Sequence, residues 1–165
     1  MGAQTAHSLE EYLRTSFEGV DREYRDGELV ERSLPDPTHG LTQMNLGAFF
    51  VALRKTTSIF PCSETRVRLR EGLILIPDVC VFLETPQKRL PDTPPLIAIE
   101  ILSPDDRHLA VRSKLEEYRA WGVPHVWLID PYLRRLYKCD EGLVEVPSLA
   151  LPEFGVELTP ADLFE

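Results

Sequence analysis

The chain has 165 residues, of which 43% are hydrophobic and 27% are charged, the balance of an ordinary globular protein with a sizeable core. Its formal net charge of −9 argues against a nonspecific DNA binder that relies on charge, although a local basic surface or an acidic cation site stays possible. No apolar run approaches the roughly 20 residues that span a bilayer, and no secretory signal is visible, so we expect a cytoplasmic protein without membrane contact.

Capping and turn signals divide the sequence into alternating helices and strands. Ser8 and Glu11 form a capping box, Asp26-Gly27 is typical of a hairpin turn, and Asp36 precedes a helix that begins at Pro37. In chain order, the first predicted elements are a helix over 8–16, a hairpin over 21–32, a helix over 37–55, and strands over 64–72, 73–77, 78–83 and 96–102. Residues 103–105 offer caps for a helix that ends near 121, and a strand over 125–131 and a hairpin over 134–146 follow. This order predicts one domain over residues 1–165, of the α+β (mixed α/β) class, with a central mixed sheet flanked by helices.

The cysteines do not indicate a disulfide framework or a zinc site. Cys62, Cys80 and Cys139 are odd in number and widely spaced, and no CxxC or Cys/His box is present. Cys80 lies in the apolar segment VCVF, where we expect a small core residue.

Two carboxylates stand within apolar, strand-like runs. Asp78 lies in LIPDVCVF and Glu100 in LIAIEILS. A buried, ionised carboxylate without partners costs several kcal/mol. If the two strands are antiparallel neighbours, both carboxylates meet at one edge of the sheet, where Mg²⁺ would relieve their repulsion. The alternative is structural: Asp78 opens a turn, and Glu100 pairs with a buried arginine.

Lys114 lies on the margin of the inward face of the helix that ends near Trp121. Val111, Leu115 and Tyr118 form the apolar stripe of this helix, and at 100° per residue Lys114 falls between Val111 and Trp121. Its ammonium group either extends to solvent or points at the two carboxylates.

Several segments together resemble a known family. YRDGELVERSLPDPTHG, IPDVCVF, LIAIEILSPDD and RSKLEEYRAWGVPHVWLIDP look like the Uma-type (Uma2) restriction-endonuclease family, which belongs to the PD-(D/E)XK nuclease superfamily. The similarity runs from about Ser8 to the final residues. It implies a restriction-endonuclease-like core and an endonuclease that hydrolyses phosphodiester bonds with Mg²⁺ or Mn²⁺. Nucleic acid, with DNA favoured, is the implied partner.

The resemblance assigns roles to four residues and exposes one departure. Asp78 matches the PD motif and Glu100 its second acid, so both, with the backbone carbonyl of Ile101, are the implied metal ligands. The motif lysine should stand at position 102, where this chain has Leu102. In Uma-type proteins the following helix supplies the lysine, and Lys114 matches that position, where it would position the attacking water.

Further candidates are weaker. Glu64 joins the metal ligands or is a solvated residue at a strand end. His39 contacts phosphate or is an ordinary residue at a helix start. Arg66 and Arg68, with Arg70, hold phosphates or form the wet face of a strand.

Two other functions were weighed against the nuclease. A catalytically inactive binding or assembly module of the same fold would explain the net charge and Leu102. A glycosidase with two carboxylates would not explain Lys114. The small size of the chain also favours a homodimer, because cutting both strands of a duplex needs two sites or two visits.

Overall fold

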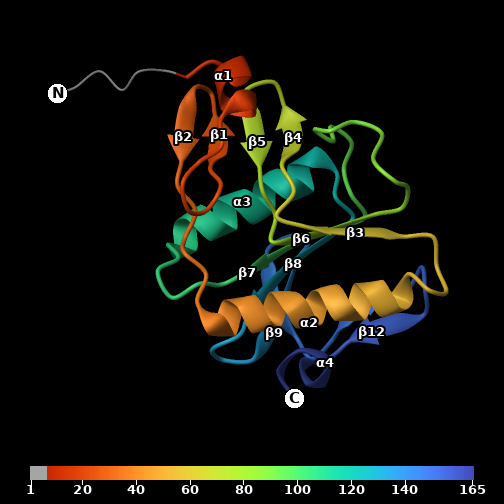
Figure 1. The fold of residues 1–165 in the computed structure, drawn as a ribbon. Coiled ribbons are helices and arrows are strands. Elements are labelled where there is room, and N and C mark those ends of the chain that lie inside the picture. The colour runs from red at the N-terminus through yellow and green to blue at the C-terminus, as the bar shows by residue number, and fades with distance from the viewer. Residues whose placement is uncertain (1–6) are drawn as a thin grey trace.

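A six-stranded mixed sheet organises residues 7–165, the part of the chain that the computed structural model describes (Figure 1). Its strand order is β10-β9-β8-β7-β6-β3. Strands β7 and β8 are parallel and are joined through helix α3, whereas every other neighbouring pair in this sheet is antiparallel. A four-stranded sheet, β2-β1-β5-β4, and the hairpin β11-β12 complete the strands.

The bounds of the elements follow the chain. The four helices of the described residues are α1 (Leu9–Arg14), α2 (Pro37–Leu53), α3 (His108–Trp121) and α4 (Pro160–Phe164). The strands are β1 (Glu23–Arg25), β2 (Glu28–Val30), β3 (Phe60–Ser63), β4 (Val67–Arg70), β5 (Leu73–Leu75), β6 (Val79–Phe82), β7 (Ile97–Ile101), β8 (His125–Asp130), β9 (Arg135–Cys139), β10 (Leu143–Val146), β11 (Leu149–Leu151) and β12 (Val156–Leu158). None of these helices is long and apolar enough to cross a membrane.

Local signals in the sequence set most helix ends. The side chain of Ser8 accepts a hydrogen bond from the backbone N–H of Glu11, and the Glu11 carboxylate accepts one from Ser8, as the capping box predicts. Asp36 caps α2 by accepting from the N–H of His39 at 2.8 Å. Gly122 ends α3 in the left-handed region, at φ 104°, which glycine adopts without strain.

The two faces of β7 carry different chemistry. Successive side chains of a strand point to opposite faces. Ile97, Ile99 and Ile101 pack in the core beneath α2, whereas Ala98 packs in the core beneath α3. Glu100 shares the face of Ala98 and therefore points toward α3.

Helix α3 lies between the two larger sheets (Figure 1). Leu115 and Tyr118 of α3 pack in one core with Val126 and Leu128 of the six-stranded sheet and with Leu75 of the smaller sheet. Helix α2 covers the opposite face of the six-stranded sheet, together with α4 and the β11-β12 hairpin. The smaller sheet therefore covers one end of α3 on the side opposite the six-stranded sheet.

The expected fold class is confirmed, and the differences are local. Strand β3 and the elements after Val146 carry no clear sequence pattern and were not predicted. Glu64 lies between β3 and β4 with φ 49°, so it does not begin the arginine-bearing strand, which is confined to Val67–Arg70. Helix α3 begins at His108 without a side-chain cap, so the caps expected at 103–105 were wrong.

Candidate active site

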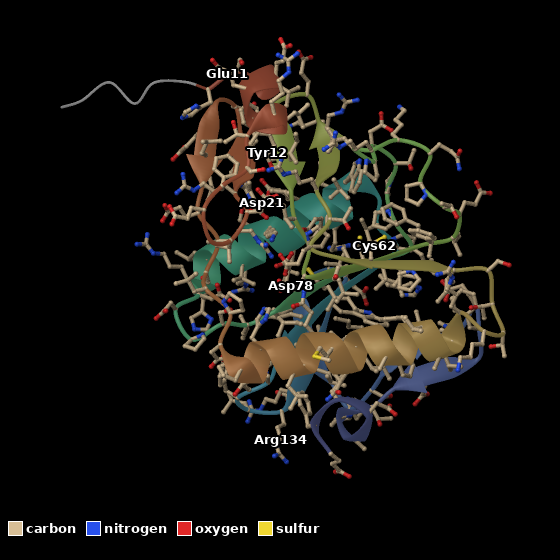
Figure 2. The ribbon with its side chains drawn as sticks, viewed as in Figure 1. Glu11, Tyr12, Asp21, Cys62, Asp78 and Arg134 are labelled. Atoms are coloured by element: carbon tan, nitrogen blue, oxygen red, sulfur yellow. The ribbon has the colours of Figure 1, made fainter. Side chains whose placement is uncertain are left out.

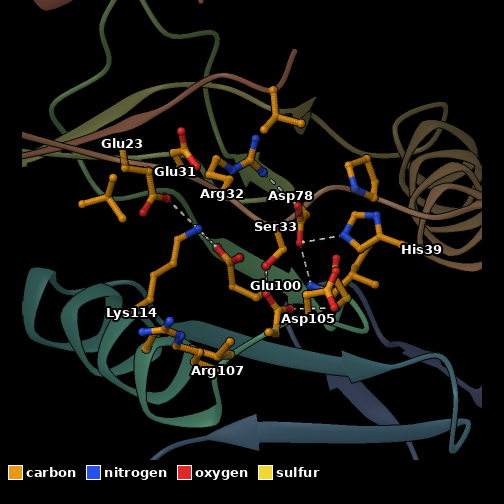
Figure 3. Close-up of a pocket in the computed structure, with 18 of the residues that line it drawn as sticks. Glu23, Glu31, Arg32, Ser33, His39, Asp78, Glu100, Asp105, Arg107 and Lys114 are labelled. Atoms are coloured by element: carbon orange, nitrogen blue, oxygen red, sulfur yellow. Dashed lines mark hydrogen bonds and ion pairs between the residues drawn. The ribbon is translucent and has the colours of Figure 1, made fainter. Parts of the chain in front are cut away.

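A pocket of about 810 Å³ opens where the start of α2, the end of β7, the helix α3 and the β1-β2 hairpin meet. Its walls carry Glu23, Arg32, Glu64, Asp78, Glu100 and Lys114. Figure 3 shows that the side chains of Glu23, Arg32, Asp78, Glu100 and Lys114 come from separate elements and converge on one space. The pocket therefore gathers ionisable groups that are far apart in the sequence.

Glu100 is held from the side of α3. Only 8% of the residue is exposed. Its Oε1 atom accepts a hydrogen bond from the hydroxyl of Tyr118 at 2.9 Å and lies 2.8 Å from Nζ of Lys114. The alternation along β7 that buries Ala98 against α3 also aims Glu100 at this helix, so the contact follows from the strand period.

The ammonium group of Lys114 is buried among three acceptors. Besides Glu100, it contacts Oε1 of Glu23 at 2.7 Å (Figure 3). It also donates to the carbonyl oxygen of Ile76 at 2.9 Å. The same Oε1 atom of Glu23 accepts the backbone N–H of Ile76 at 2.9 Å. A lysine has three N–H donors, so all of them have an acceptor within the protein.

Asp78 is surrounded by donors. Its Oδ2 atom accepts the backbone N–H of Ile101 at 2.7 Å and lies 3.4 Å from Nε2 of His39, while its Oδ1 atom accepts from Nη2 of Arg32 at 3.0 Å. The bond to Ile101 ties the start of β6 to the end of β7, where the two strands pair antiparallel. Asp78 and Glu100 therefore lie at the same edge of the sheet, as the sequence predicts.

Glu64 stands at the mouth of the pocket. It pairs with Nη1 of Arg32 and accepts from Nε2 of Gln43 at 2.9 Å. The same Gln43 nitrogen donates to the backbone carbonyl of Asp78 at 2.9 Å. Because 44% of the Glu64 side chain is exposed, this carboxylate is far better solvated than the two deeper ones.

The pocket buries more negative than positive charge. Glu23, Asp78 and Glu100 are buried carboxylates, against the buried Lys114 and the guanidinium of Arg32, whose side chain is 11% exposed. When His39 is neutral, the excess is one carboxylate. Burial, followed by repulsion from the Asp78 and Glu23 charges, raises the pKa of Glu100 to about 8, although Lys114 opposes the shift. A proton or a cation is therefore favoured at Glu100.

The surrounding charges favour the ionised forms of Lys114 and Asp78. Burial opposes the charged form of Lys114, but the charges of Glu100, Glu23 and Asp78 outweigh it and raise the lysine pKa. Burial likewise opposes ionisation of Asp78, but His39, Lys114 and Arg32 together lower its pKa. Asp78 in turn raises the pKa of His39 against the effect of burial.

The chemical type of the available ligands suits a hard divalent cation. Two carboxylates, Asp78 and Glu100, line one pocket that holds an excess negative charge, and carboxylate oxygens are the ligands that Mg²⁺ prefers. Residues 7–165 contain no ready-made cluster of three or more His, Cys, Asp or Glu side chains around a common point. Water or substrate oxygens would have to complete the coordination, which is usual for Mg²⁺.

The residues singled out from the sequence fall into two groups. Asp78, Glu100, Ile101, Lys114, Glu64 and His39 all line the pocket. Arg66 and Arg68 do not line it. Arg66 pairs with Asp21 at 2.6 Å and Arg68 with Asp92 at 3.1 Å. Leu102 packs against the core beneath α3, so it leaves no cationic group at the motif position.

Sequence reasoning missed Glu23, Arg32 and Tyr118. Tyr118 was assigned to the apolar stripe, and its hydroxyl partner became visible only with the fold. Glu23 and Arg32 flank the β1-β2 hairpin in a stretch rich in charged residues, so nothing in the local pattern separates them from solvated neighbours. The one available signal was the quoted segment YRDGELVERSLPDPTHG, which contains Arg32.

Comparisons with known proteins point to one family. The family model Uma2, described as "Putative restriction endonuclease", matches residues 9–164. The chain is also similar to a solved structure described as a "putative nuclease belonging to DUF820 from Anabaena variabilis ATCC 29413", with 22% sequence identity and a TM-score of 0.79. That likeness covers 95% of this chain and 97% of the other, and at this identity it concerns the fold alone. No curated protein matches.

Proposed function

Because the chain belongs to the Uma2 family, described as "Putative restriction endonuclease", we propose that it is a metal-dependent endonuclease whose catalytic centre is Asp78, Glu100 and Lys114. The observation that carries this proposal is the excess of buried negative charge in the pocket, where three carboxylates face Lys114 and Arg32 when His39 is neutral. An ordinary structural cluster has no need of such an excess, because unpaired buried charge destabilises a fold.

Asp78 and Glu100, with the backbone carbonyl of Ile101, would hold the metal ion, and Mg²⁺ is the expected species, with Mn²⁺ as a substitute. When bound, the ion supplies Lewis-acid activation of water and neutralises charge on the phosphate. Glu64, which lines the same pocket, would reach the ion through water. The N–H of Ile101 and Nε2 of His39 orient the Asp78 carboxylate.

Lys114 would stabilise the negative charge that develops during hydrolysis and orient the attacking water. Its three donors already contact Glu23, Glu100 and Ile76. One of these contacts must therefore open before Lys114 can donate to a water molecule. Glu100 is the natural one to release, because its pKa is raised and it is also the residue proposed to turn toward the metal.

Arg32 gives the pocket a cation that can also contact substrate. It pairs with Asp78 and Glu64 in the structure. The guanidinium group binds phosphate oxygens through two parallel hydrogen bonds. We assign Arg32 and His39 to neutralising the charge of the substrate phosphate. Arg32 would be released for this contact when Asp78 binds the metal ion.

Several wider features stay predictions. The substrate is nucleic acid, with DNA favoured, and residues 1–165 act as one nuclease domain. A homodimer and a cytoplasmic location also stay predictions. The size of the chain supports the dimer, since two sites would cut both strands of a duplex.

A catalytically inactive binding or assembly module is the second candidate. The observation in its favour is the full engagement of the Lys114 donors, together with Leu102 in place of the motif lysine. In that case the cluster of charges would serve only to fix β1, β7 and α3 together.

Plasmid nicking separates the two candidates. Purified protein is incubated with supercoiled plasmid in Mg²⁺ or Mn²⁺, with EDTA and with the Asp78→Ala protein as controls. The nuclease predicts nicking that requires metal and disappears in Asp78→Ala. Nicking that persists in Asp78→Ala would reveal a contaminant, and failure to cleave any DNA or RNA would favour the inactive module.

A further inference from the structure

A second depression, of about 890 Å³, adjoins the candidate active site. The end of α1, the segment after it and the loop before β7 form its walls. Glu64 lines both depressions, so they meet at the mouth of the site. Figure 2 shows Asp21, which lines this depression, and Tyr12, which contacts Arg66 of its wall, on the same side of the molecule as the smaller sheet and above Asp78.

The second depression is richer in basic groups than a chain of net charge −9 would suggest. Three arginines line it, Arg14, Arg66 and Arg89, against the carboxylates of Asp21 and Glu64. The hydroxyl residues Thr15 and Ser16 add further donors. Arginine and hydroxyl donors are the groups that contact the phosphates of nucleic acids.

The three arginines differ in how they are held. Arg66 is fixed, because Nε and Nη2 both contact Asp21 at 2.6 Å and the guanidinium lies 4.3 Å from the centre of the Tyr12 ring. Arg14 pairs with Glu10 one helical turn away. Arg89 is exposed and makes no ion pair with any other residue in the described range. Arg89 is therefore available to an external anion.

The active-site pocket also contains an arginine that resembles Arg89 in this respect. Arg107, at the start of α3, lines that pocket and likewise forms no ion pair within residues 7–165 (Figure 3). Most other arginines near the site are paired, including Arg25 with Glu117 and Arg32 with Asp78. Each of the two adjoining depressions thus carries one arginine that forms no ion pair within residues 7–165, although Asp105 and Asp106 precede Arg107 in the chain.

We propose that the two depressions together hold one strand of nucleic acid, with Arg89 and Arg107 binding backbone phosphates on either side of the scissile bond. This inference rests on the proposed nuclease function, because it places the reacting phosphate beside Asp78 and Glu100. It makes the substrate a polynucleotide that extends beyond the cut in both directions, and not a mononucleotide or dinucleotide. Recognition is through the backbone, so it does not depend on base sequence.

The salt dependence of binding tests the inference. A fluorescent single-stranded oligonucleotide, longer than the roughly 4–16 nucleotides that a binding groove covers, is titrated in EDTA, where cleavage is prevented. Binding is followed by fluorescence anisotropy at several salt concentrations. The slope of log K against log salt is negative, and each lost phosphate contact reduces its magnitude by about 0.7 for a single strand. Arg89→Gln and Arg107→Gln should each show this loss, and the double variant about twice as much.

Arg134→Gln is the matched control. Arg134 lines neither depression and lies far from Asp78 in Figure 2. The control should bind as the wild type does. Wild-type slopes in both Arg89→Gln and Arg107→Gln, or no binding by the wild type, would overturn the inference.

The same titration keeps this inference apart from the nuclease assignment. If the protein nicks plasmid but its binding depends on neither arginine, the proposed nuclease function holds and the proposed strand path is wrong. If binding depends on the arginines but the protein never cleaves, the strand path holds and the nuclease function is wrong.

Discussion

The ammonium group of Lys114, on α3, lies 2.8 Å from the carboxylate of Glu100, on β7, although the two residues are separated by a turn and half a helix. Position 102, two residues after Glu100, carries leucine and packs against the same core as α3. The contact therefore places a cation beside the second acid of the site from a neighbouring element. Substitutions at Lys114 and Leu102 can therefore test the proposed relocation of the lysine directly.

Replacing Lys114 with methionine should abolish most nuclease activity while keeping the packing of the long side chain. We expect a loss of about 10²–10³-fold in cleavage rate, the usual cost of removing one preorganised donor. Single-turnover cleavage of a labelled oligonucleotide measures the loss. An unchanged rate would remove Lys114 from the catalytic centre.

A second substitution can restore the lysine at the standard position. Leu102 and Glu100 share a face of the strand, because side chains two residues apart point the same way. In the Lys114→Met protein, Leu102→Lys should recover part of the lost cleavage rate, since the new ammonium group can reach the same carboxylate. Leu102→Met in the same background controls for packing and should recover nothing.

Glu23→Gln should lower the pKa of Lys114 without changing the proposed metal ligands. Glutamine can still accept the Ile76 N–H, but it removes a negative charge that helps to raise the pKa of Lys114. The lysine should then lose its proton at lower pH, so the alkaline limb of the pH–rate profile should move to lower pH. Glu28→Gln, an exposed change on the same hairpin, should leave the profile in place, as should Glu23→Gln if Glu23 is merely structural.

Glu100→Gln should change how stability depends on pH in the metal-free protein. The folded pKa of Glu100, about 8, exceeds its ordinary value of 4.5. Between these values the unfolded chain loses the proton while the folded protein keeps it, so stability falls as pH rises. Glu100→Gln removes this loss, and at pH 8 it should raise the free energy of unfolding relative to wild type by up to about 4 kcal/mol.

Urea unfolding at pH 5 and pH 8 in EDTA measures this effect. The wild type should lose stability between the two pH values by more than Glu100→Gln does. If both proteins lose the same amount of stability between pH 5 and pH 8, Glu100 is not the group that carries the excess charge.

The elements with strong local signals were predictable, and so was the pairing of the two acids. The capping box at Ser8, the turn at Asp26-Gly27 and the glycine at 122 depend only on neighbours in the chain. Glu100 and Asp78 stood out because a carboxylate within an apolar run needs a reason. The helical angle of Lys114 placed it on the inward margin, where the structure finds it buried.

The rest depends on contacts that no local pattern records. Strand β3 has only four residues, one of them Pro61, and it exists because it pairs with β6. Glu23 contacts Lys114 only because the small sheet covers α3, and Arg32 reaches Asp78 only because the hairpin returns over the pocket. Arg66 and Arg68 were weighed as phosphate ligands, and their pairing with Asp21 and Asp92 emerges from the fold.

The central claim is that the excess buried carboxylate marks a divalent cation site. Calorimetric titration of Mn²⁺ into the wild type and into Glu100→Gln, near pH 7, tests this most directly. We predict one saturable site per chain in the wild type, with release of protons into the buffer because Glu100 must ionise to bind, and binding at least tenfold weaker in Glu100→Gln. Absence of a saturable site in the wild type, or equal affinity in the two proteins, would contradict the claim.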